Sequence, residues 1–323
     1  MRYLAVALLP ALVVLAQAPK QTPAPKPAAA KQAAPAKPGA PETDDSARII
    51  LDVTRVNILY TVSDRKGRFV NNLVKDDFEI LESKRKQNIV EFTAESDLPL
   101  RLAILVDTSN SIRDRFRFIQ QAATDFVRTA MRTQDKAIVV SFDTVAELAA
   151  DLTEDRVVLE NAIQRLRPGG GTAMYDAIFF ACRDKLMQDQ PRDKFRRALV
   201  LLSDGEDNQS HYTREQALEM AHKADVVIYA ISTNISHSAI NGDKVMRRFA
   251  EETGGLAFFP FKAEDLGQSF ENVANELRHQ YNVLYRPEPL KADGLYHAVD
   301  IRVRDRKELI VRARRGYYAP LAP

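Results

Sequence analysis

Residues 102–111 constrain the fold of this chain more than any other stretch, because they join a wholly apolar run to a row of oxygen-bearing side chains. The apolar run, residues 102–106, predicts a short strand covered on both faces, which is typical of a parallel sheet. Asp107 ends the run, and Ser109 and Ser111 follow at intervals of two residues. In an open parallel sheet, ligands bind just beyond the carboxyl ends of the strands. The stretch therefore predicts a buried parallel strand that ends in an oxygen-rich site.

The middle of the chain alternates apolar runs with segments of helical periodicity. Uninterrupted apolar runs predict strands at residues 102–106, 137–142, 198–202, 226–231 and 256–259. Helices are expected in the intervals, at residues 112–130, 159–166, 173–186 and 270–277. Thr213 with Gln216 is a capping box, and Gly254 with Gly255 indicates a helix end. This alternation predicts an α/β domain with a doubly wound, mainly parallel sheet.

Segments on both sides of this domain alternate apolar and polar residues with period two. Residues 56–62, followed by turn residues 64–67, indicate one hairpin, and residues 78–92 indicate a second. The same alternation returns at residues 281–285, 299–303 and 309–313. Since neither group is large enough alone, we expect the two to pair into one small β-sandwich, with the α/β domain inserted between them.

The amino-terminal residues differ in composition from the rest. Arg2 precedes an apolar run at residues 4–15, and Val14 and Ala16 are small residues at the spacing of a cleavage site, which predicts a signal peptide. The predicted organisation is a signal peptide at 1–18, a linker rich in Pro, Ala and Lys at 19–46, a β segment at 47–97, the α/β domain at 98–280 and a second β segment at 281–323. We therefore expect an exported protein that is periplasmic, secreted or on the cell surface. In the alternative, the first segment stays uncleaved and is the only contact with a membrane.

Charge and cysteine content exclude several classes of partner and site. The net charge is +2, so no general attraction to nucleic acid follows. A single cysteine, Cys182, excludes an internal disulfide framework and a multi-thiolate zinc site, and its expected place is the interior of a helix. Six arginines near the end of the chain alternate on predicted strands, and we interpret them as a solvated sheet face rather than a nucleic-acid-binding patch. They are Arg302, Arg304, Arg306, Arg312, Arg314 and Arg315.

Two further segments add oxygen ligands at strand-to-helix junctions of the α/β domain. A glycine run at residues 169–171 ends in Thr172, and Asp204 follows the apolar run 198–202. We therefore expect five oxygen-bearing side chains to converge on one sheet edge, and an all-oxygen set suits Mg²⁺, with Mn²⁺ or Ca²⁺ as alternatives, rather than zinc or copper.

Interpretations of the same residues that involve no metal also stay open. Ser109, Ser111 and Asp107 can simply cap a helix that begins near residue 112, and Thr172 can cap the next one. Asp176 is interpreted as a favourable charge near a helix amino terminus. Glu206 and Asp207 are interpreted as solvated loop charges.

The ordered pattern Asp107, Ser109, Ser111, Thr172 and Asp204 resembles the metal-ion-dependent adhesion site of von Willebrand factor type A domains. Residues 171–177, 201–205 and 250–255 also resemble segments of that family, in the same order. The β segments, with the motif at residues 314–320, are similar to an exported bacterial group called VWFA-related acidobacterial domain proteins. The resemblance implies that the serines and the threonine bind the cation directly, that the carboxylates act partly through water, and that one coordination position stays open.

The expected function follows from that open position. A glutamate or aspartate of a protein partner would complete the coordination sphere, so we expect binding rather than enzymatic turnover. One alternative is a hydrolase, although no Gly-x-Ser-x-Gly or His-Glu-x-x-His motif is present and the pairing of Ser203 and Asp204 with His211 is generic. Another is a structural protein whose metal site is vestigial.

Overall fold

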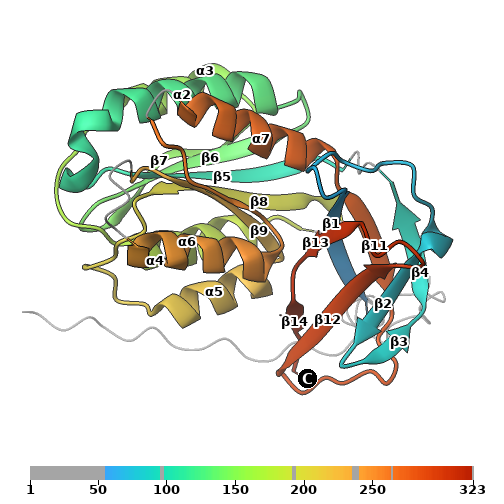
Figure 1. Ribbon diagram of the computed structural model, residues 1–323. Helices are drawn as coiled ribbons and strands as arrows, with labels where there is room; N and C mark the ends of the chain where they lie inside the picture. The colour runs from blue at the N-terminus through green and yellow to red at the C-terminus, as the bar shows by residue number, and fades with distance from the viewer. Residues whose placement is uncertain (1–54, 95–97, 191–193, 235–239, 263–264, 322–323) are drawn as a thin grey trace, which may run out of the picture. The chain divides into compact units, whose positions relative to one another are not determined.

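The computed structural model describes residues 55–94, 98–190, 194–234, 240–262 and 265–321. These residues form a six-stranded sheet with helices on both faces and two four-stranded antiparallel sheets (Figure 1). The predicted signal peptide and linker lie outside the described residues. In the part of the chain that is described, none of the helices has the length and apolar character needed to span a bilayer.

The central sheet has the strand order β10-β9-β8-β5-β6-β7. Its strands are β5 (Leu100–Asp107), β6 (Lys136–Phe142), β7 (Ala146–Thr153), β8 (Arg196–Ser203), β9 (Val226–Ser232) and β10 (Ala257–Phe258). All neighbours are parallel except β6 and β7. Every residue of β5 is buried, as an apolar strand covered on both faces must be. The prediction of a mainly parallel α/β sheet is confirmed, whereas β7 was not predicted.

Helices cover both faces of this sheet (Figure 1). One face carries α2 (Phe116–Ala130), α3 (Arg156–Arg165) and α7 (Leu266–Arg278), and the other carries α4 (Met174–Phe180), α5 (Arg214–Lys223) and α6 (Ile240–Thr253). A 3-10 turn, η2 (Asn110–Arg115), precedes α2, and a π-helical turn, η3 (Ala181–Leu186), continues α4. The capping box of Thr213 and Gln216 begins α5, and Gly254 ends α6 with a positive φ of 88°. Cys182 is fully buried in η3.

The antiparallel sheets have the orders β13-β1-β11-β4 and β14-β12-β2-β3. Their strands are β1 (Val56–Ser63), β2 (Phe78–Glu82), β3 (Arg85–Gln87), β4 (Ile89–Thr93), β11 (Tyr281–Tyr285), β12 (Tyr296–Val303), β13 (Ile310–Ala313) and β14 (Gly316–Tyr318), and a 3-10 turn, η1 (Lys75–Asp77), precedes β2. β1 pairs with β11, and β2 pairs with β12, so each sheet combines strands from before and after the α/β domain. Side chains of both sheets share one buried core, which includes Ile58, Tyr60 and Tyr281. The two flanking segments therefore form a β-sandwich together.

The partners of individual strands differ from the predicted hairpins. A turn with Gly67 at a φ of 79° does follow β1 and reverses the chain, because Ser63 bridges Phe69 and the Val70 amide donates to the Val62 carbonyl at 2.9 Å. The longer pairings of β1, however, are with β11 and β13. In the second predicted hairpin β2 pairs with β3, whereas β4 joins the other sheet beside β11. Period-two alternation fixes which face of a strand is buried but not its partner, so the first predicted hairpin forms only next to its turn and the main partners of β1 were not predicted.

The prediction of a solvated sheet face for the six arginines is confirmed only at Arg302, which is exposed on β12. Arg304 and Arg306 are exposed in the turn after β12, and Arg315 is exposed but forms ion pairs with Glu251 and Glu252 of α6. Arg312, however, forms an ion pair with Glu276 of α7, and Arg314 forms one with Asp225, which precedes β9. The outward side of β13 and of the segment after it faces the α/β domain rather than water. Arg312 and Arg314 therefore bind protein groups across the junction of the sandwich and the α/β domain.

Candidate metal centre

The predicted site residues lie at the carboxyl ends of neighbouring strands. Asp107 is the last residue of β5, and Asp204 directly follows β8, its parallel neighbour. Ser109 and Ser111 follow β5 at the start of η2. Because parallel strands end at the same edge of the sheet, side chains far apart in the sequence meet there.

Hydrogen bonds join four of the five residues. The Ser109 amide donates to Oδ1 of Asp107 at 2.8 Å, and the hydroxyls of Ser109 and Ser111 are 2.9 Å apart. The Ser111 hydroxyl donates to Oδ2 of Asp204 at 2.6 Å. Ser203, which the sequence analysis did not assign, donates from its hydroxyl to Oδ2 of Asp107 at 2.6 Å. Although Ser109 is the residue before η2, its side chain forms no capping hydrogen bond, so its hydroxyl serves the cluster instead.

Thr172, the fifth residue, reaches the same edge through its glycine-rich loop. The Gly169 amide donates to the carbonyl of Thr108 at 2.6 Å, and the Asn110 amide donates to the carbonyl of Gly170 at 3.3 Å. Thr172 is buried, with 4% of its surface exposed. The hydrogen bonds that join the other four residues do not extend to its hydroxyl. The structure thus places Thr172 beside the cluster without making it part of the hydrogen-bonded set.

A second loop, residues 206–210, holds the backbone of Thr172. Oδ1 of Asn208 accepts a hydrogen bond from the Thr172 amide at 3.0 Å, and the amides of Asn208 and Gln209 donate to the Thr172 carbonyl at 3.0 Å each. Asp207 accepts from the amide of Tyr175 at 2.9 Å and from the hydroxyl of Ser210 at 2.7 Å. The interpretation of Asp207 as a solvated charge was therefore wrong. The sequence signal for Asp207 and Asn208 was their position three and four residues after Asp204, on the loop that contacts Thr172.

Asp176 fixes the same loop from α4. Its Oδ1 accepts hydrogen bonds from the amides of His211 and Tyr212, both at 2.9 Å. Partial burial raises the pKa of this carboxyl, but hydrogen bonds from Tyr212 and His211 outweigh burial and lower the pKa below its ordinary value. Its position in the first turn of α4 agrees with the helix-dipole interpretation, and its contacts show that it also anchors the loop.

Gly205 is required by the packing next to Asp204. Its φ is 81°, and a Cβ atom built on it would lie 2.3 Å from the carbonyl oxygen of Gly242 in α6. Only glycine tolerates both conditions. The backbone after Asp204 is therefore held in place by the close approach of α6.

The electrostatics of the cluster favour a bound cation. Asp107 is fully buried, and burial raises its pKa to about 6, with a smaller contribution from the Asp204 carboxylate. Within the described ranges, neither carboxylate forms an ion pair with a lysine, arginine or histidine. A divalent cation would supply the missing positive charge.

The donor set also fits a hard cation. The described residues contain no group of three or more His, Cys, Asp or Glu side chains that could hold a metal ion. A metal at this edge would therefore depend on hydroxyl oxygens in addition to the two carboxylates. Such an all-oxygen set suits Mg²⁺, Mn²⁺ or Ca²⁺.

The hydrolase alternative finds no support in the partners of Ser203 and His211. The Ser203 hydroxyl donates to Asp107, while Nδ1 of His211 lies 2.9 Å from Oδ2 of Asp176. A nucleophilic serine would need a hydrogen bond to its general base. These two side chains are instead committed to different carboxylates.

Fold and sequence together define the class of this domain. Residues 102–206 match the sequence model of the von Willebrand factor type A domain, and these residues include all five predicted ligands. The chain therefore contains a von Willebrand factor type A domain, a module that commonly mediates protein interactions.

Individual relatives are distant. The chain is 26% identical over 181 residues to calcium-activated chloride channel regulator 1 of Bos taurus, and the match covers 54% of this chain and 19% of that protein. Proximal thread matrix protein 1 from the mussel byssus has a similar fold, with a TM-score of 0.50, 19% identity, and coverage of 61% of this chain and 51% of that one. A von Willebrand factor type A protein from Catenulispora acidiphila gives a TM-score of 0.47 at 13% identity, covering 83% of this chain and 74% of that one. The chain thus spans about one fifth of the curated bovine relative.

Proposed function

We propose that this protein is an exported, metal-dependent binding module that recognises an acidic group on a protein partner. The proposed ligands are Asp107, Ser109, Ser111, Thr172 and Asp204, and the proposed metal is Mg²⁺. The observation that carries the proposal is the hydrogen-bonded cluster of hydroxyls and two carboxylates at the carboxyl ends of β5 and β8, in which neither carboxylate has an ion-pair partner among the described residues.

The residues of this chain would act by binding and orienting. Asp107 is anchored by the Ser109 amide and the Ser203 hydroxyl, so its two oxygens keep a fixed position. The side chain of Asn208 fixes the backbone of Thr172, because its Oδ1 accepts a hydrogen bond from the Thr172 amide. A bound cation would supply positive charge at the surface, and neutral hydroxyl ligands leave that charge less compensated than carboxylates would. A carboxylate from a partner is the group that such a site attracts.

Calorimetric titration of the purified protein with Mg²⁺ and Mn²⁺ tests the metal part. One saturable site is expected, and it should disappear in Asp107→Ala and weaken at least tenfold in Thr172→Ala. Asp114→Ala is the matched control, because Asp114 is an exposed carboxylate in η2 outside the hydrogen-bonded cluster. Equal metal binding by wild type and Asp107→Ala would show that the assigned ligands are wrong.

Selection from a displayed random-peptide library tests the partner part. Immobilised protein is screened with Mg²⁺ and, in parallel, with a chelator. Sequences containing aspartate or glutamate should be enriched with Mg²⁺ alone, and replacing that acid by its amide should abolish binding. Enrichment of the same peptides under both conditions would contradict a metal-mediated mechanism.

Export is a separate part of the proposal. It rests on the predicted signal peptide at residues 1–18, which lies outside the described residues. Mass spectrometry of the native protein tests it, since cleavage near residue 18 is expected. An intact amino terminus on a protein that stays in the cytoplasm would refute it.

A further inference from the structure

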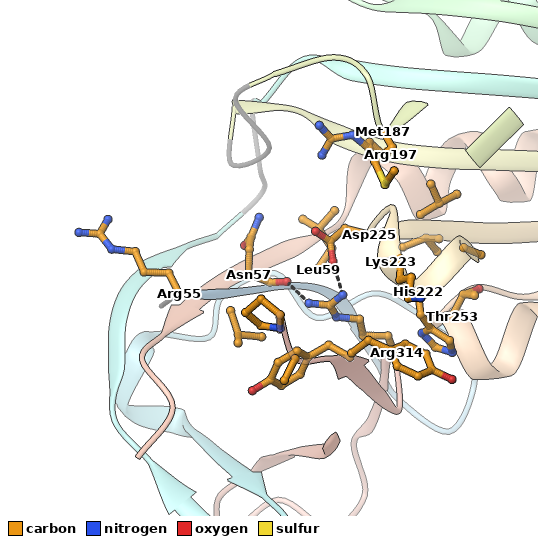
Figure 2. A pocket seen from close by; sticks show the side chains of 18 of the residues that line it. Arg55, Asn57, Leu59, Met187, Arg197, His222, Lys223, Asp225, Thr253 and Arg314 are labelled. Atoms are coloured by element: carbon orange, nitrogen blue, oxygen red, sulfur yellow. Dashed lines mark hydrogen bonds and ion pairs between the residues drawn. The ribbon is translucent and has the colours of Figure 1, made fainter. Parts of the chain in front are cut away.

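A cavity of about 630 Å³ lies between the β-sandwich and the α/β domain. β1 and the segment Tyr317–Leu321 contribute one side of it, and the beginnings of β8 and β9 contribute the other. Figure 2 shows its labelled side chains, among them Asn57, Leu59, His222 and Arg314. Small-molecule sites commonly have volumes of roughly 300 to 1,000 Å³, so this cavity is large enough for an organic ligand.

Strand alternation explains why side chains line this space. On β1, Val56 and Ile58 face the sandwich core, so Asn57 and Leu59 face the cavity. Arg197, at the start of β8, also lines it, whereas Asp204 follows the other end of that strand. At about 3.3 Å per residue, the cavity and the candidate metal centre are roughly 20 Å apart. The cavity is thus a second location, separate from the site of the proposed metal function.

Three polar atoms of the cavity lining are buried without a hydrogen-bond partner. They are Nδ1 of His222, Nε of Arg314 and Oδ1 of Asn57. Only 4% of His222 and 9% of Arg314 are exposed. The terminal nitrogens of Arg314 are already used, because Nη1 binds Asp225 and Nη2 donates to the carbonyl of Asn57 at 2.8 Å (Figure 2). Buried polar atoms are nearly always paired with protein groups, ordered water or a ligand, so these three atoms leave hydrogen-bonding capacity at the cavity lining.

Burial and the nearby Arg314 charge lower the pKa of His222 to about 4. The imidazole is consequently neutral at pH 7, with one nitrogen able to donate a hydrogen bond and the other able to accept one.

Positive charge predominates around the cavity. Arg55, Arg197, Lys223 and Arg314 line it, and Asp225, the ion-pair partner of Arg314, is the carboxylate of the lining. Arg55 lies 3.8 Å from Glu91, which is outside the lining, and both side chains are exposed to water. The guanidinium of Arg197 donates to the carbonyls of Leu186 and Asp189. Lys223 is bridged to Glu219, outside the lining, and its ammonium lies 5.5 Å from the ring centre of Tyr318. An anionic ligand is favoured by this imbalance.

The rest of the lining is apolar or aromatic. Leu59, Val226 and Leu284 contribute aliphatic surface, and Phe195, Tyr317 and Tyr318 contribute rings. We propose that the cavity binds a small organic anion that carries one acidic group on an apolar or aromatic body. The acidic group accepts a hydrogen bond from Nε of Arg314, and the body packs against Leu59, Leu284 and the tyrosines.

Two fluorescent probes that differ in charge test this assignment. 8-Anilinonaphthalene-1-sulfonate carries an anionic group on aromatic rings, and N-phenyl-1-naphthylamine has the same rings without the sulfonate. Titration of the full chain should show one saturable site for the anionic probe, with at least tenfold weaker binding of the neutral probe. A near-ultraviolet circular dichroism spectrum shows that the protein used is folded, since loosened proteins also bind the anionic probe. Absence of saturable binding, or equal affinity for both probes, would overturn the proposal.

Variants locate the binding in the cavity. Leu59→Trp fills the space without changing charge and should abolish binding of the anionic probe. The double variant Arg55→Gln/Lys223→Gln changes two exposed cations of the lining and should weaken binding several-fold. Its matched control is Arg65→Gln/Lys66→Gln, which removes one arginine and one lysine from the turn after β1.

The comparison between these variants decides the outcome. Equal weakening by the two double variants would show that binding follows net charge rather than the cavity, and would refute the proposal. Unchanged binding in a folded Leu59→Trp protein would refute it as well. Neither result depends on metal, so the proposal fails or stands independently of the proposed adhesion function.

Discussion

Replacing Glu276 by alanine is expected to destabilise the protein by about 3 kcal/mol, because this residue is a buried link between α7 and the sandwich. Only 4% of Glu276 is exposed. Its carboxylate accepts a hydrogen bond from the hydroxyl of Thr61 in β1 at 3.1 Å and forms an ion pair with Arg312 of β13. Arg312 also donates to the hydroxyl of Ser63 at 3.2 Å.

The expected loss of stability follows from the charge of Arg312, which Glu276→Ala leaves without its partner. Burial raises the pKa of Glu276 even though Arg312 favours the ionised form, so the ion pair offsets only part of the desolvation cost of the carboxylate. The pair itself is consequently worth little, but removing one partner leaves the other charge without compensation, which costs about 3 to 5 kcal/mol in buried pairs. Because 21% of the Arg312 side chain is exposed to water, we expect the lower end of that range.

Urea unfolding of Glu276→Ala, Arg312→Ala and the double variant measures this effect. The double variant should be more stable than the sum of the single losses predicts, by at least about 1 kcal/mol, since it leaves no unpaired charge. Glu271→Ala is the matched control, because Glu271 is an exposed glutamate on the same helix, and it should change stability by less than about 0.5 kcal/mol. If Glu276→Ala were no more destabilising than Glu271→Ala, the assigned role of this link would be wrong.

Three further changes have expected outcomes. Gly205→Ala introduces a Cβ that would lie 2.3 Å from the carbonyl oxygen of Gly242, at a φ of 81°, so it should lower the free energy of unfolding by about 2 kcal/mol or more and weaken Mg²⁺ binding in calorimetry. An unchanged melting temperature would contradict this packing. Asn208→Ala removes the acceptor of the Thr172 amide and should weaken Mg²⁺ binding about tenfold while the fold persists, as loss of a group that orients a metal ligand commonly does. Affinity equal to that of wild type would mean that Asn208 does not position Thr172. For His222 the pKa falls from 6.5 to about 4 on folding, so below pH 6.5 the unfolded chain takes up a proton that the native protein does not, and up to about 3 kcal/mol of stability is lost between pH 6.5 and pH 4. Urea unfolding across this range should show a shallower loss for His222→Gln, and parallel curves would refute the assignment.

The central sheet was largely predictable because its strands are covered on both faces. An apolar run such as that of β5 has one physical explanation in a chain of this length, namely burial between two layers of helices. β7 escaped prediction because it is an edge strand: Glu147, Leu148 and Ala149 are exposed, and no continuous apolar run marks it. Strand partners in the sandwich could not be predicted either, because side-chain alternation does not indicate which strand pairs with which.

The candidate metal centre was predictable to the extent that it depends on strand ends. The position of Asp107 at the end of β5 and of Asp204 directly after β8 follows from the general arrangement of parallel sheets, and the structure joins both to serine hydroxyls. The supporting roles of Asn208 and Asp207 depend on how two loops fold against each other, which local sequence does not specify. The same limit explains Arg312 and Arg314, whose partners Glu276 and Asp225 belong to the α/β domain.

Pairing between β1 and β11 has a consequence for the order in which this protein can fold. The hydrogen-bonded neighbours of β1 are β11 and β13, and the neighbour of β4 is β11. β1 and β4 therefore cannot form these pairings until β11 and β13 are synthesised, after the whole α/β domain. Of the strands that precede that domain, β2 and β3 alone pair with each other. During synthesis, β1 therefore has an apolar face and open edges until the α/β domain is complete, and folding of that domain, which ends in α7 just before β11, delivers the missing strand to its partners.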